Sequence, residues 1–285
     1  MDRLIFHNDR VVPLAEARLS PGQMGLLMGW GVFTTLRIYE GFPFAFDRHW
    51  ARMTHDAERL GVELPYRQAE VWQAVVDLAK ANRHPESTAR LSFVKNHGGL
   101  WADAQGKPPT DLLIFTRELV NWPAAHRLKL LPDAVFAAGR LAGAKMISWV
   151  QNAGTLEKVH DEGFDDALLL NEIGHIAECT SANFFLVRDG CVFTPPLSSG
   201  CLPGITRDVL REVVPSTCYE FVEQNLTPKD LPSAEEVFIS STTREVAAVG
   251  EIWPQWKFDA PGPATRLLEA AFQKYVQTHL QRALS

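Results

Sequence analysis

Lys145 lies in the segment LAGAKMISWVQN, residues 141–152, among small and apolar residues and without an acidic neighbour. A lysine beside an apolar surface usually runs its stem along that surface and keeps its charged head in water. The alternative is an amine in a partly dry pocket, where desolvation lowers the pKa and frees the amine as a nucleophile. The segment by itself leaves both interpretations open.

Glu178 is a candidate partner for that chemistry, in the stretch GFDDALLLNEIGHIAECTSANFF, residues 163–185. Residues 167–170 suit a buried strand, and residues 171–174 suit a turn, so Glu178 comes at the end of a second short strand. A carboxylate in this position is often a solvated strand end. If it is buried, it needs a cationic or N–H partner.

Two segments have the features of anion-binding turns. In the first, Gly204-Ile205-Thr206 begins a predicted helix, where free N–H groups and the helix dipole bind a phosphate or a carboxylate well. Thr206 serves equally well as a simple N-cap. In the second, ISSTTREV, residues 239–246, has four consecutive hydroxyl side chains after a predicted strand, including Thr242 and Thr243. The alternative is an ordinary Ser/Thr-rich turn.

Arg52 completes the set, five residues after Asp47 on a predicted helix, where a surface arginine is the usual interpretation. Each of these residues is weak evidence alone. Together, an amine, a carboxylate, two anion-binding turns and an arginine match what pyridoxal 5′-phosphate requires. Its aldehyde needs a lysine, its ring nitrogen an acidic partner, and its phosphate an arginine with helix N-terminal amides.

The first part of the chain must supply a sheet and helices to hold Arg52. In chain order the pattern predicts strands at 4–6, 11–13, 32–39 and 42–46, helices at 47–60 and 68–81, and strands at 90–94 and 112–115. Asp47 is the expected N-cap of the first helix, and Gly61 ends it. The loop HGGLWADAQGKPPT, residues 97–110, has the length of a lid or a binding segment.

The second part is expected to be larger and richer in strands. The pattern predicts strands at 128–131, 167–170, 184–187, 191–194 and 237–240, and helices at 153–162, 206–213 and 264–284. We therefore expect an α+β fold. A small α+β domain spans 1–118, a linker 119–127, and a larger strand-rich domain with peripheral helices, carrying Lys145, spans 128–285.

The composition excludes several classes of protein. A chain of 285 residues with 46% hydrophobic and 22% charged residues is ordinary for a globular protein, and a net charge of −6 argues against a dedicated nucleic-acid or anionic-membrane binder. The first residues lack the apolar core of a secretory leader, and no window is apolar for long enough to span a bilayer. We expect a cytoplasmic protein with reduced thiols at its four cysteines, Cys179, Cys191, Cys201 and Cys218.

The sequence resembles the fold-type IV pyridoxal-phosphate enzymes, which include branched-chain aminotransferases, D-amino-acid aminotransferases, (R)-amine transaminases and aminodeoxychorismate lyases. GWGVFTTLR, residues 29–37, is similar to the family's G-x-G-[VC]-[FY]-x-x-x-[RK] strand. FDRHWARM resembles its H-x-x-R phosphate-arginine helix, and SSTTREV its hydroxyl-rich turn. Asp165 and Glu178, which come 20 and 33 residues after Lys145, match the family spacing, and the resemblance covers well over half of the chain.

The resemblance implies a role for each matching residue. Lys145 bonds to the cofactor aldehyde and then moves the proton between the substrate Cα and the cofactor C4′, while Glu178 keeps the pyridine nitrogen protonated. The implied phosphate ligands are Arg52, the N–H groups of Ile205 and Thr206, and Thr242. The implied substrate contacts are Thr243, Arg37 and Phe33. The resemblance also implies a C-terminal pseudo-barrel and a homodimer.

The sequence departs from its relatives in the segment MISWVQN, where they often carry Asn and Tyr or Arg, and Trp149 would fill part of the pocket. Arg90 takes the place of the substrate-carboxylate arginine of branched-chain enzymes only if strand alternation turns it to the pocket face. The activity expected from the resemblance is transfer of an amino group from a branched-chain L-amino acid to a 2-oxo acid such as 2-oxoglutarate. The alternatives are a D-amino-acid or (R)-amine transaminase, an aminodeoxychorismate lyase, and a silent ligand-binding protein.

Overall fold

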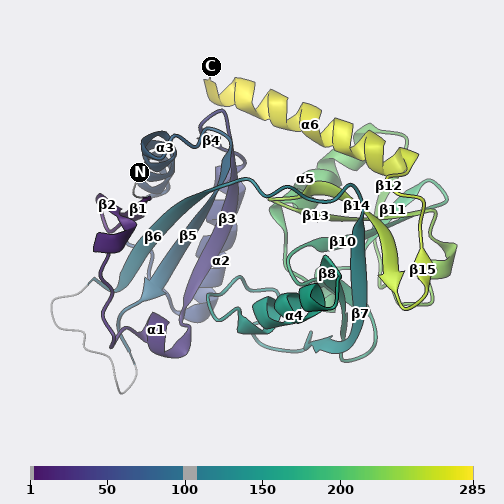
Figure 1. Ribbon diagram of the computed structural model, residues 1–285, viewed down its shortest axis with the longest axis horizontal. Helices are drawn as coiled ribbons and strands as arrows, with labels where there is room; N and C mark the ends of the chain where they lie inside the picture. The colour runs from purple at the N-terminus through teal and green to yellow at the C-terminus, as the bar shows by residue number, and fades with distance from the viewer. Residues whose placement is uncertain (1–2, 99–107, 285) are drawn as a thin grey trace. The chain divides into compact units, whose positions relative to one another are not determined.

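The computed structural model describes residues 3–98 and 108–284, which form two compact units (Figure 1). The first unit contains the chain up to Val120 together with Lys145–Trp149. The second contains Asn121–Ala144 and Val150–Arg282. Most of the predicted lid or binding loop, 97–110, lies outside the described residues.

The first unit is built on a six-stranded antiparallel sheet in the order β2-β1-β6-β5-β3-β4. Its strands are β1 Leu4–His7, β2 Arg10–Pro13, β3 Gly31–Tyr39, β4 Phe42–Pro43, β5 Ser87–Lys95 and β6 Thr110–Glu118. Its helices are α1 Met24–Met28, α2 Phe46–Leu60 and α3 Gln68–Ala81, with a 3-10 turn at Leu14–Glu16. The hairpin, the strand at 32–39 and the helix at 68–81 are confirmed.

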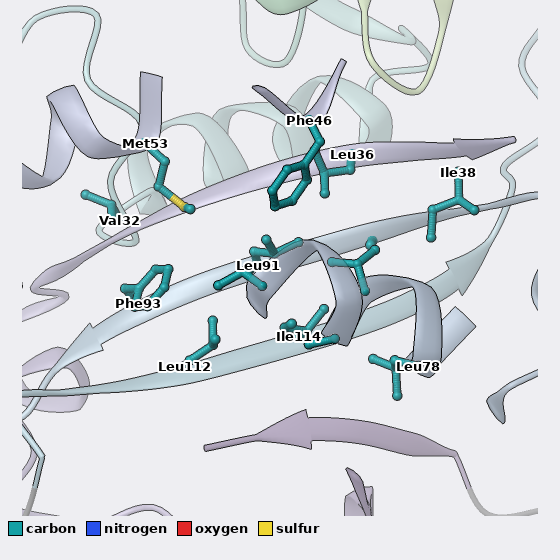
Figure 2. Packing of buried hydrophobic residues seen from close by; sticks show 14 of the residues in the cluster. Val32, Leu36, Ile38, Phe46, Met53, Leu78, Leu91, Phe93, Leu112 and Ile114 are labelled. Atoms are coloured by element: carbon teal, nitrogen blue, oxygen red, sulfur yellow. The ribbon is translucent and has the colours of Figure 1, made fainter. Parts of the chain in front are cut away.

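The helices α2 and α3 pack on one face of this sheet, where a single apolar core forms (Figure 2). On β3, alternation turns Val32, Leu36 and Ile38 into that core. The side chains between them, Phe33, Thr35 and Arg37, therefore belong to the opposite face of the sheet.

Two local predictions in this unit are wrong. The second strand after Gly41 is only Phe42–Pro43, because Ala45 takes up a left-handed conformation and helix α2 begins at Phe46. Ala45, not Asp47, is the N-cap of α2, and no side chain caps this helix. Gly61 ends the helix as expected, in the left-handed conformation that glycine adopts without a Cβ penalty.

The second unit is built on a nine-stranded mixed sheet with the path β12-β11-β10-β13-β14-β7-β8-β9, to which β15 adds beside β14. Its strands are β7 His126–Val135, β8 Asp166–Asn171, β9 Ile176–Cys179, β10 Asn183–Arg188, β11 Cys191–Thr194, β12 Glu220–Glu223, β13 Glu236–Ser241, β14 Glu245–Trp253 and β15 Trp256–Lys257. The helices are α4 Val150–Asp161, α5 Ile205–Val213 and α6 Pro263–Leu284, and 3-10 turns lie at Leu197–Ser199, Val214–Ser216 and Leu231–Ser233.

The α+β class is confirmed, with a small antiparallel N-terminal sheet and a larger C-terminal one. Strand β7 begins at His126, inside the stretch predicted as linker, and β14 was not predicted. The boundaries 1–118, 119–127 and 128–285 stay a prediction. The compact units differ from them at Lys145–Trp149, which group with the first unit.

Two further observations concern the chain as a whole. The four cysteines are free thiols. Among the described residues, no helix combines the length and the apolar character needed to cross a membrane.

Candidate active site

The two glycines of the G-x-G motif make room for the segment that carries Lys145. Residues 145–147 run antiparallel to the start of β3: Phe33 N donates to the Lys145 carbonyl at 3.1 Å and Ile147 N to the Gly31 carbonyl at 3.0 Å. A Cβ at Gly31 would lie 2.3 Å from the Phe93 carbonyl oxygen and 2.9 Å from Ile147 Cδ1. Gly29 has φ +63°, and a Cβ there would lie 2.8 Å from Ser148 Cβ. The motif therefore allows this segment to extend the sheet.

Helix α2 and an aromatic pair surround Lys145. Its backbone N–H donates to Asp56 Oδ2 at 3.0 Å. Asp56 is buried, and desolvation raises the pKa of its carboxyl, although the Lys145 N–H acts in the opposite direction. The Lys145 amine lies 4.7 Å from the centroid of the Phe33 ring and 5.7 Å from that of Trp149, and these rings meet edge to face at 6.1 Å. The amine is thus held over two rings of its own unit.

Arg90 lies on the same face of the sheet as Phe33. In the register of β3 and β5, Arg90 is directly opposite Thr35, whereas its neighbours Ala89 and Leu91 belong to the core on the other face. The Arg90 guanidinium stacks over the Phe33 ring with its Cζ 3.8 Å from the centroid. Alternation along β5 therefore turns Arg90 to the face of Phe33. The sequence alone had left open which face of the sheet this arginine takes.

Arg52 is held by a buried pair that the sequence analysis did not single out. Its Nη2 donates to Thr34 Oγ1 at 2.9 Å, and the same hydroxyl lies 2.8 Å from His49 Nδ1. Thr34 and His49 are each 1% exposed. Burial, then the positive charges of Arg52 and Lys145, hold the pKa of His49 well below its usual range. His49 is therefore neutral, and its Nδ1 can accept the Thr34 proton while Thr34 accepts from Arg52.

Arg37 is on the same face of β3 as Phe33, but its guanidinium interacts with Glu86 and Tyr39. Its Nη2 lies 3.1 Å from Glu86 Oε2, and its guanidinium stacks on Tyr39 with Cζ 4.6 Å from the ring centroid. The first unit thus gathers four of the predicted site residues, and one of them, Arg37, is paired with a carboxylate.

Glu178 is in strand β9 of the second unit, where it is half-buried and has a backbone N–H partner. Its Oε2 accepts a hydrogen bond from the backbone N–H of Leu202 at 3.0 Å. Two residues later in the chain, Gly204 is the N-cap of α5, and no side chain caps this helix. Thr206 is therefore the second residue of the helix, and the alternative that it is the N-cap is wrong.

The start of α5 is an open helix N-terminus. Ile205 and Thr206 are its first two residues, and first-turn N–H groups have no intrahelical acceptor. A Cβ at Gly204 would lie 2.0 Å from Asn183 Oδ1. Asn183 is buried and fixed by its own hydrogen bond to the Leu202 carbonyl at 2.9 Å. A side chain at Gly204 would therefore force this arrangement apart.

The predicted hydroxyl-rich turn joins β13 to β14. Ser241 and Glu245 pair as the last register positions of the two strands, which leaves Thr242, Thr243 and Arg244 in the loop. Thr243 Oγ1 lies 3.4 Å from Ser241 Oγ, and its carbonyl accepts a hydrogen bond from the Trp122 indole at 3.0 Å. The second unit thus holds Glu178, the α5 N-terminus and this turn.

Several residues that hold the site residues in place are not apparent from the sequence, among them Thr34, His49, Asp56, Trp122 and Asp166. His49 had a usable signal, because it is the first residue of the H-x-x-R pattern that ends at Arg52. The others had none. The contacts that they make with Arg52, Lys145, Thr243 and Arg244 span 18 or more positions along the chain, where spacing carries no information.

Comparison with known proteins identifies the family. The family model described as amino-transferase class IV matches residues 31–252. The chain belongs to the class IV aminotransferases. A putative branched-chain-amino-acid aminotransferase of Methanocaldococcus jannaschii is 29% identical over 255 residues, 87% of each chain. D-alanine aminotransferase of Staphylococcus epidermidis is 27% identical over 290 residues, 96% of this chain and 98% of the relative.

The fold of this class IV aminotransferase matches solved structures of the family. A T.th. branched-chain amino acid aminotransferase, in complex with N-(5′-phosphopyridoxyl)-L-glutamate, superposes with a TM-score of 0.86 and is 27% identical. The match covers 98% of this chain and 95% of that one. The expected fold-type IV architecture is therefore confirmed. Of the activities weighed from the sequence, these comparisons support the aminotransferase.

Pyridoxal 5′-phosphate is the cofactor of this class. The residues of the chain fit it. The first unit offers an amine over aromatic rings and a guanidinium held by a buried hydroxyl, which suit an aldehyde and a phosphate. The second unit offers a carboxylate oriented by a backbone N–H and an uncapped helix N-terminus, which suit a ring nitrogen and a phosphate.

Proposed function

We propose that this aminotransferase moves the amino group of a branched-chain L-amino acid to a 2-oxo acid such as 2-oxoglutarate. The observation that carries the proposal is the aromatic pair Phe33 and Trp149 beside the Lys145 amine, with the Arg90 guanidinium stacked on the same Phe33 ring. An apolar wall suits an aliphatic side chain. A guanidinium suits the second carboxylate of 2-oxoglutarate.

When bound, pyridoxal 5′-phosphate supplies an aldehyde that takes up the amino group and a ring that accepts negative charge. Lys145 provides the amine that attaches the cofactor, and it moves the proton at the substrate Cα. The hydrogen bond between its backbone N–H and Asp56 fixes the main chain from which this side chain works. Glu178, itself oriented by the Leu202 N–H, holds a proton on the pyridine nitrogen.

The proposed phosphate ligands are a guanidinium, two backbone N–H groups and a hydroxyl. Arg52 supplies a guanidinium, the N–H groups of Ile205 and Thr206 supply the positive end of a helix dipole, and Thr242 supplies a hydroxyl. Thr243 contributes to binding of the substrate carboxylate. Phe33 and Arg37 line the substrate side, Arg37 with its charge shared with Glu86. We further propose that the enzyme works as a homodimer.

A D-amino-acid aminotransferase is the second candidate. The supporting observation is the similarity to D-alanine aminotransferase of Staphylococcus epidermidis, which extends over 96% of this chain. Chirality follows from which wall of the pocket receives the substrate carboxylate, and both candidates use the same lysine.

A panel of amino donors tests the proposal. We expect turnover with 2-oxoglutarate to be fastest for L-leucine, L-isoleucine and L-valine, and slow for D-alanine and for simple (R)-amines. A preference for D-alanine would establish the second candidate instead. Pyruvate release from aminodeoxychorismate, measured in parallel, would indicate a lyase.

The role of Lys145 needs its own test. The purified protein is expected to be yellow, and borohydride reduction followed by peptide mass spectrometry should find the cofactor on Lys145. Lys145→Ala should abolish turnover while the circular dichroism spectrum stays unchanged. Full activity in this variant would refute the assignment of the catalytic lysine. Sedimentation velocity measures the expected dimer.

A further inference from the structure

Arg244, in the hydroxyl-rich turn between β13 and β14, makes an ion pair that none of the roles above uses. Its side chain is 2% exposed and its Nη2 lies 3.2 Å from Oδ2 of Asp166, which is 0% exposed. Nη1 donates to Ser181 Oγ at 2.8 Å, and the guanidinium stacks over the Trp122 ring with Cζ 4.0 Å from the centroid. The side chain thus leads from the turn into the interior of the second unit.

Asp166 in turn holds the chain just after Glu178. Its Oδ1 accepts from the backbone N–H of Thr180 at 3.0 Å and from the Thr180 hydroxyl at 2.5 Å, and its Oδ2 accepts from Ser181 Oγ at 2.9 Å. Thr180 and Ser181 follow Glu178 by two and three residues. The Asp166 carboxylate is therefore a common anchor for the end of β9 and, through Arg244, for the turn.

Further bonds hold the loop residues of the turn. The backbone N–H of Arg244 donates to Ser241 Oγ at 3.2 Å. The Trp122 indole, whose ring lies against the Arg244 guanidinium, donates to the Thr243 carbonyl at 3.0 Å. The main chain at Thr242 and Thr243 is thereby tied to Trp122 on one side and to the Asp166–Arg244 pair on the other.

A buried ion pair is poorly explained by stability alone. Desolvation of two charges offsets most of their attraction, so apolar residues of similar volume often stabilise a fold as well or better. What such a pair does provide is a single geometry, because a guanidinium and a carboxylate bond only in defined orientations. The location of the pair, between the end of β9 and the turn, indicates what that geometry serves.

We propose that Arg244 is a positioning residue. Through its contacts with Asp166 and Trp122, it holds the Thr242–Thr243 turn in a fixed position relative to the strand that carries Glu178. This fixed position sets the affinity for the cofactor phosphate. The proposal rests on the phosphate-binding role of Thr242 proposed above. Arg244 itself points inward to Asp166 and acts through the turn, whereas Thr242 binds the phosphate. The gain is preorganisation, because the turn need not be ordered when the phosphate binds.

The test compares two ligands that differ only in the phosphate. The full-length protein, cleared of cofactor, is titrated with pyridoxal 5′-phosphate and with pyridoxal, and the absorbance change reports binding. We expect Arg244→Met to weaken pyridoxal 5′-phosphate binding by about tenfold to a hundredfold, the size of effect seen when a group that orients a metal ligand is removed. Binding of pyridoxal should change less than about twofold, because it does not use the turn.

Three further variants separate positioning from folding. Arg244→Lys keeps the charge beside Asp166 and should recover part of the lost affinity. Asp166→Asn/Arg244→Met removes both charges, while Asn keeps an acceptor for Thr180. This double variant should therefore fold even if Arg244→Met alone does not. It should show the same loss of affinity for the phosphate form of the ligand. Arg127→Met, which breaks the exposed pair with Glu251 on the same sheet, is the matched control and should bind both ligands normally.

Thr242→Val distinguishes the inference from its premise. If Thr242→Val loses phosphate-dependent affinity but the folded Arg244 variants do not, Arg244 is structural only and the inference is overturned while the proposed function stands. If neither Thr242→Val nor the Arg244 variants lose affinity, the turn is not the phosphate site. The inference and the proposed phosphate-binding role of Thr242 are then both overturned. Equal losses for pyridoxal and its phosphate in the Arg244 variants would also overturn the inference.

Discussion

The backbone N–H of Lys145 donates a hydrogen bond of 3.0 Å to the buried carboxylate of Asp56 on helix α2. The two residues are 89 positions apart, yet this bond ties the lysine segment to the helix that also carries Arg52. The main chain at the lysine is therefore set by a helix of the first unit, although Lys145 follows the predicted linker.

The first prediction concerns this bond. Asp56→Ala should lower the free energy of unfolding by about 1–3 kcal/mol, because it leaves the half-buried Lys145 N–H without its acceptor. Asp56→Asn keeps an oxygen at the same position and removes a charge whose burial is unfavourable, so it should change stability by less than about 1 kcal/mol. Urea denaturation measures both. An equal loss in the two variants would show that charge, and not the acceptor, matters here.

The second prediction concerns pH and His49. The pKa of His49 lies well below the usual 6.5, so below pH 6.5 the unfolded chain takes up a proton that the folded protein does not. Stability contributed by the neutral ring is present above pH 6.5 and is lost as the pH falls toward the folded-state pKa. The slope from one such histidine is about 1.4 kcal/mol per pH unit.

Urea denaturation between pH 7.5 and 5 checks this expectation. His49→Gln should flatten the profile below pH 6.5, whereas His55→Gln, at an exposed position of the same helix, should leave it unchanged. Burial also lowers the pKa of His126, so a residual slope of the same sign should persist in His49→Gln. An unaltered profile in His49→Gln would contradict the assignment.

The third prediction concerns the start of α5. Gly204→Ala would bring a Cβ to 2.0 Å from Asn183 Oδ1, and overpacking of this kind costs about 1–3 kcal/mol. The variant should also bind pyridoxal 5′-phosphate more weakly, because Asn183 and Leu202 must move beside the helix N-terminus. Gly204→Ala/Asn183→Ala removes the clash and should recover much of the stability in thermal unfolding. Failure to recover would place the effect in the backbone of Gly204 itself.

The fourth prediction concerns Arg90. If its guanidinium binds the second carboxylate of 2-oxoglutarate, Arg90→Met should raise the KM for 2-oxoglutarate at least about tenfold, since a charged hydrogen bond contributes about 1.5–3 kcal/mol. The KM for 2-oxobutyrate, which lacks that carboxylate, should change little. Arg67→Met is the matched control, because Arg67 is an exposed arginine of the same unit, paired with Glu70, and has no proposed role in binding. A rise for both acceptors alike would mean that Arg90 supports Phe33 only.

The sequence predicted elements well wherever a pattern repeats within a few residues. Helix 68–81 and the strand over 191–194 have the predicted bounds, and both have apolar residues at regular spacing. Strand β14 was not predicted, because Gly250 and Glu251 interrupt its alternation of apolar and polar residues. The N-cap of α2 was misplaced because Ala45 takes a left-handed conformation that its residue type does not favour.

By itself, the sequence determined which chemical groups are available for the site and which family the chain belongs to. The lysine, the glutamate, the arginine and the two anion-binding turns are recognisable from their residue types and their spacing along the chain. Only the tertiary structure decided which side of the sheet Arg90 faces, that Gly29 and Gly31 admit the Lys145 segment, and that Arg244 is paired with Asp166. The physical reason is range. Local periodicity sets secondary structure, whereas a buried pair depends on where distant strands pack, and no spacing encodes that.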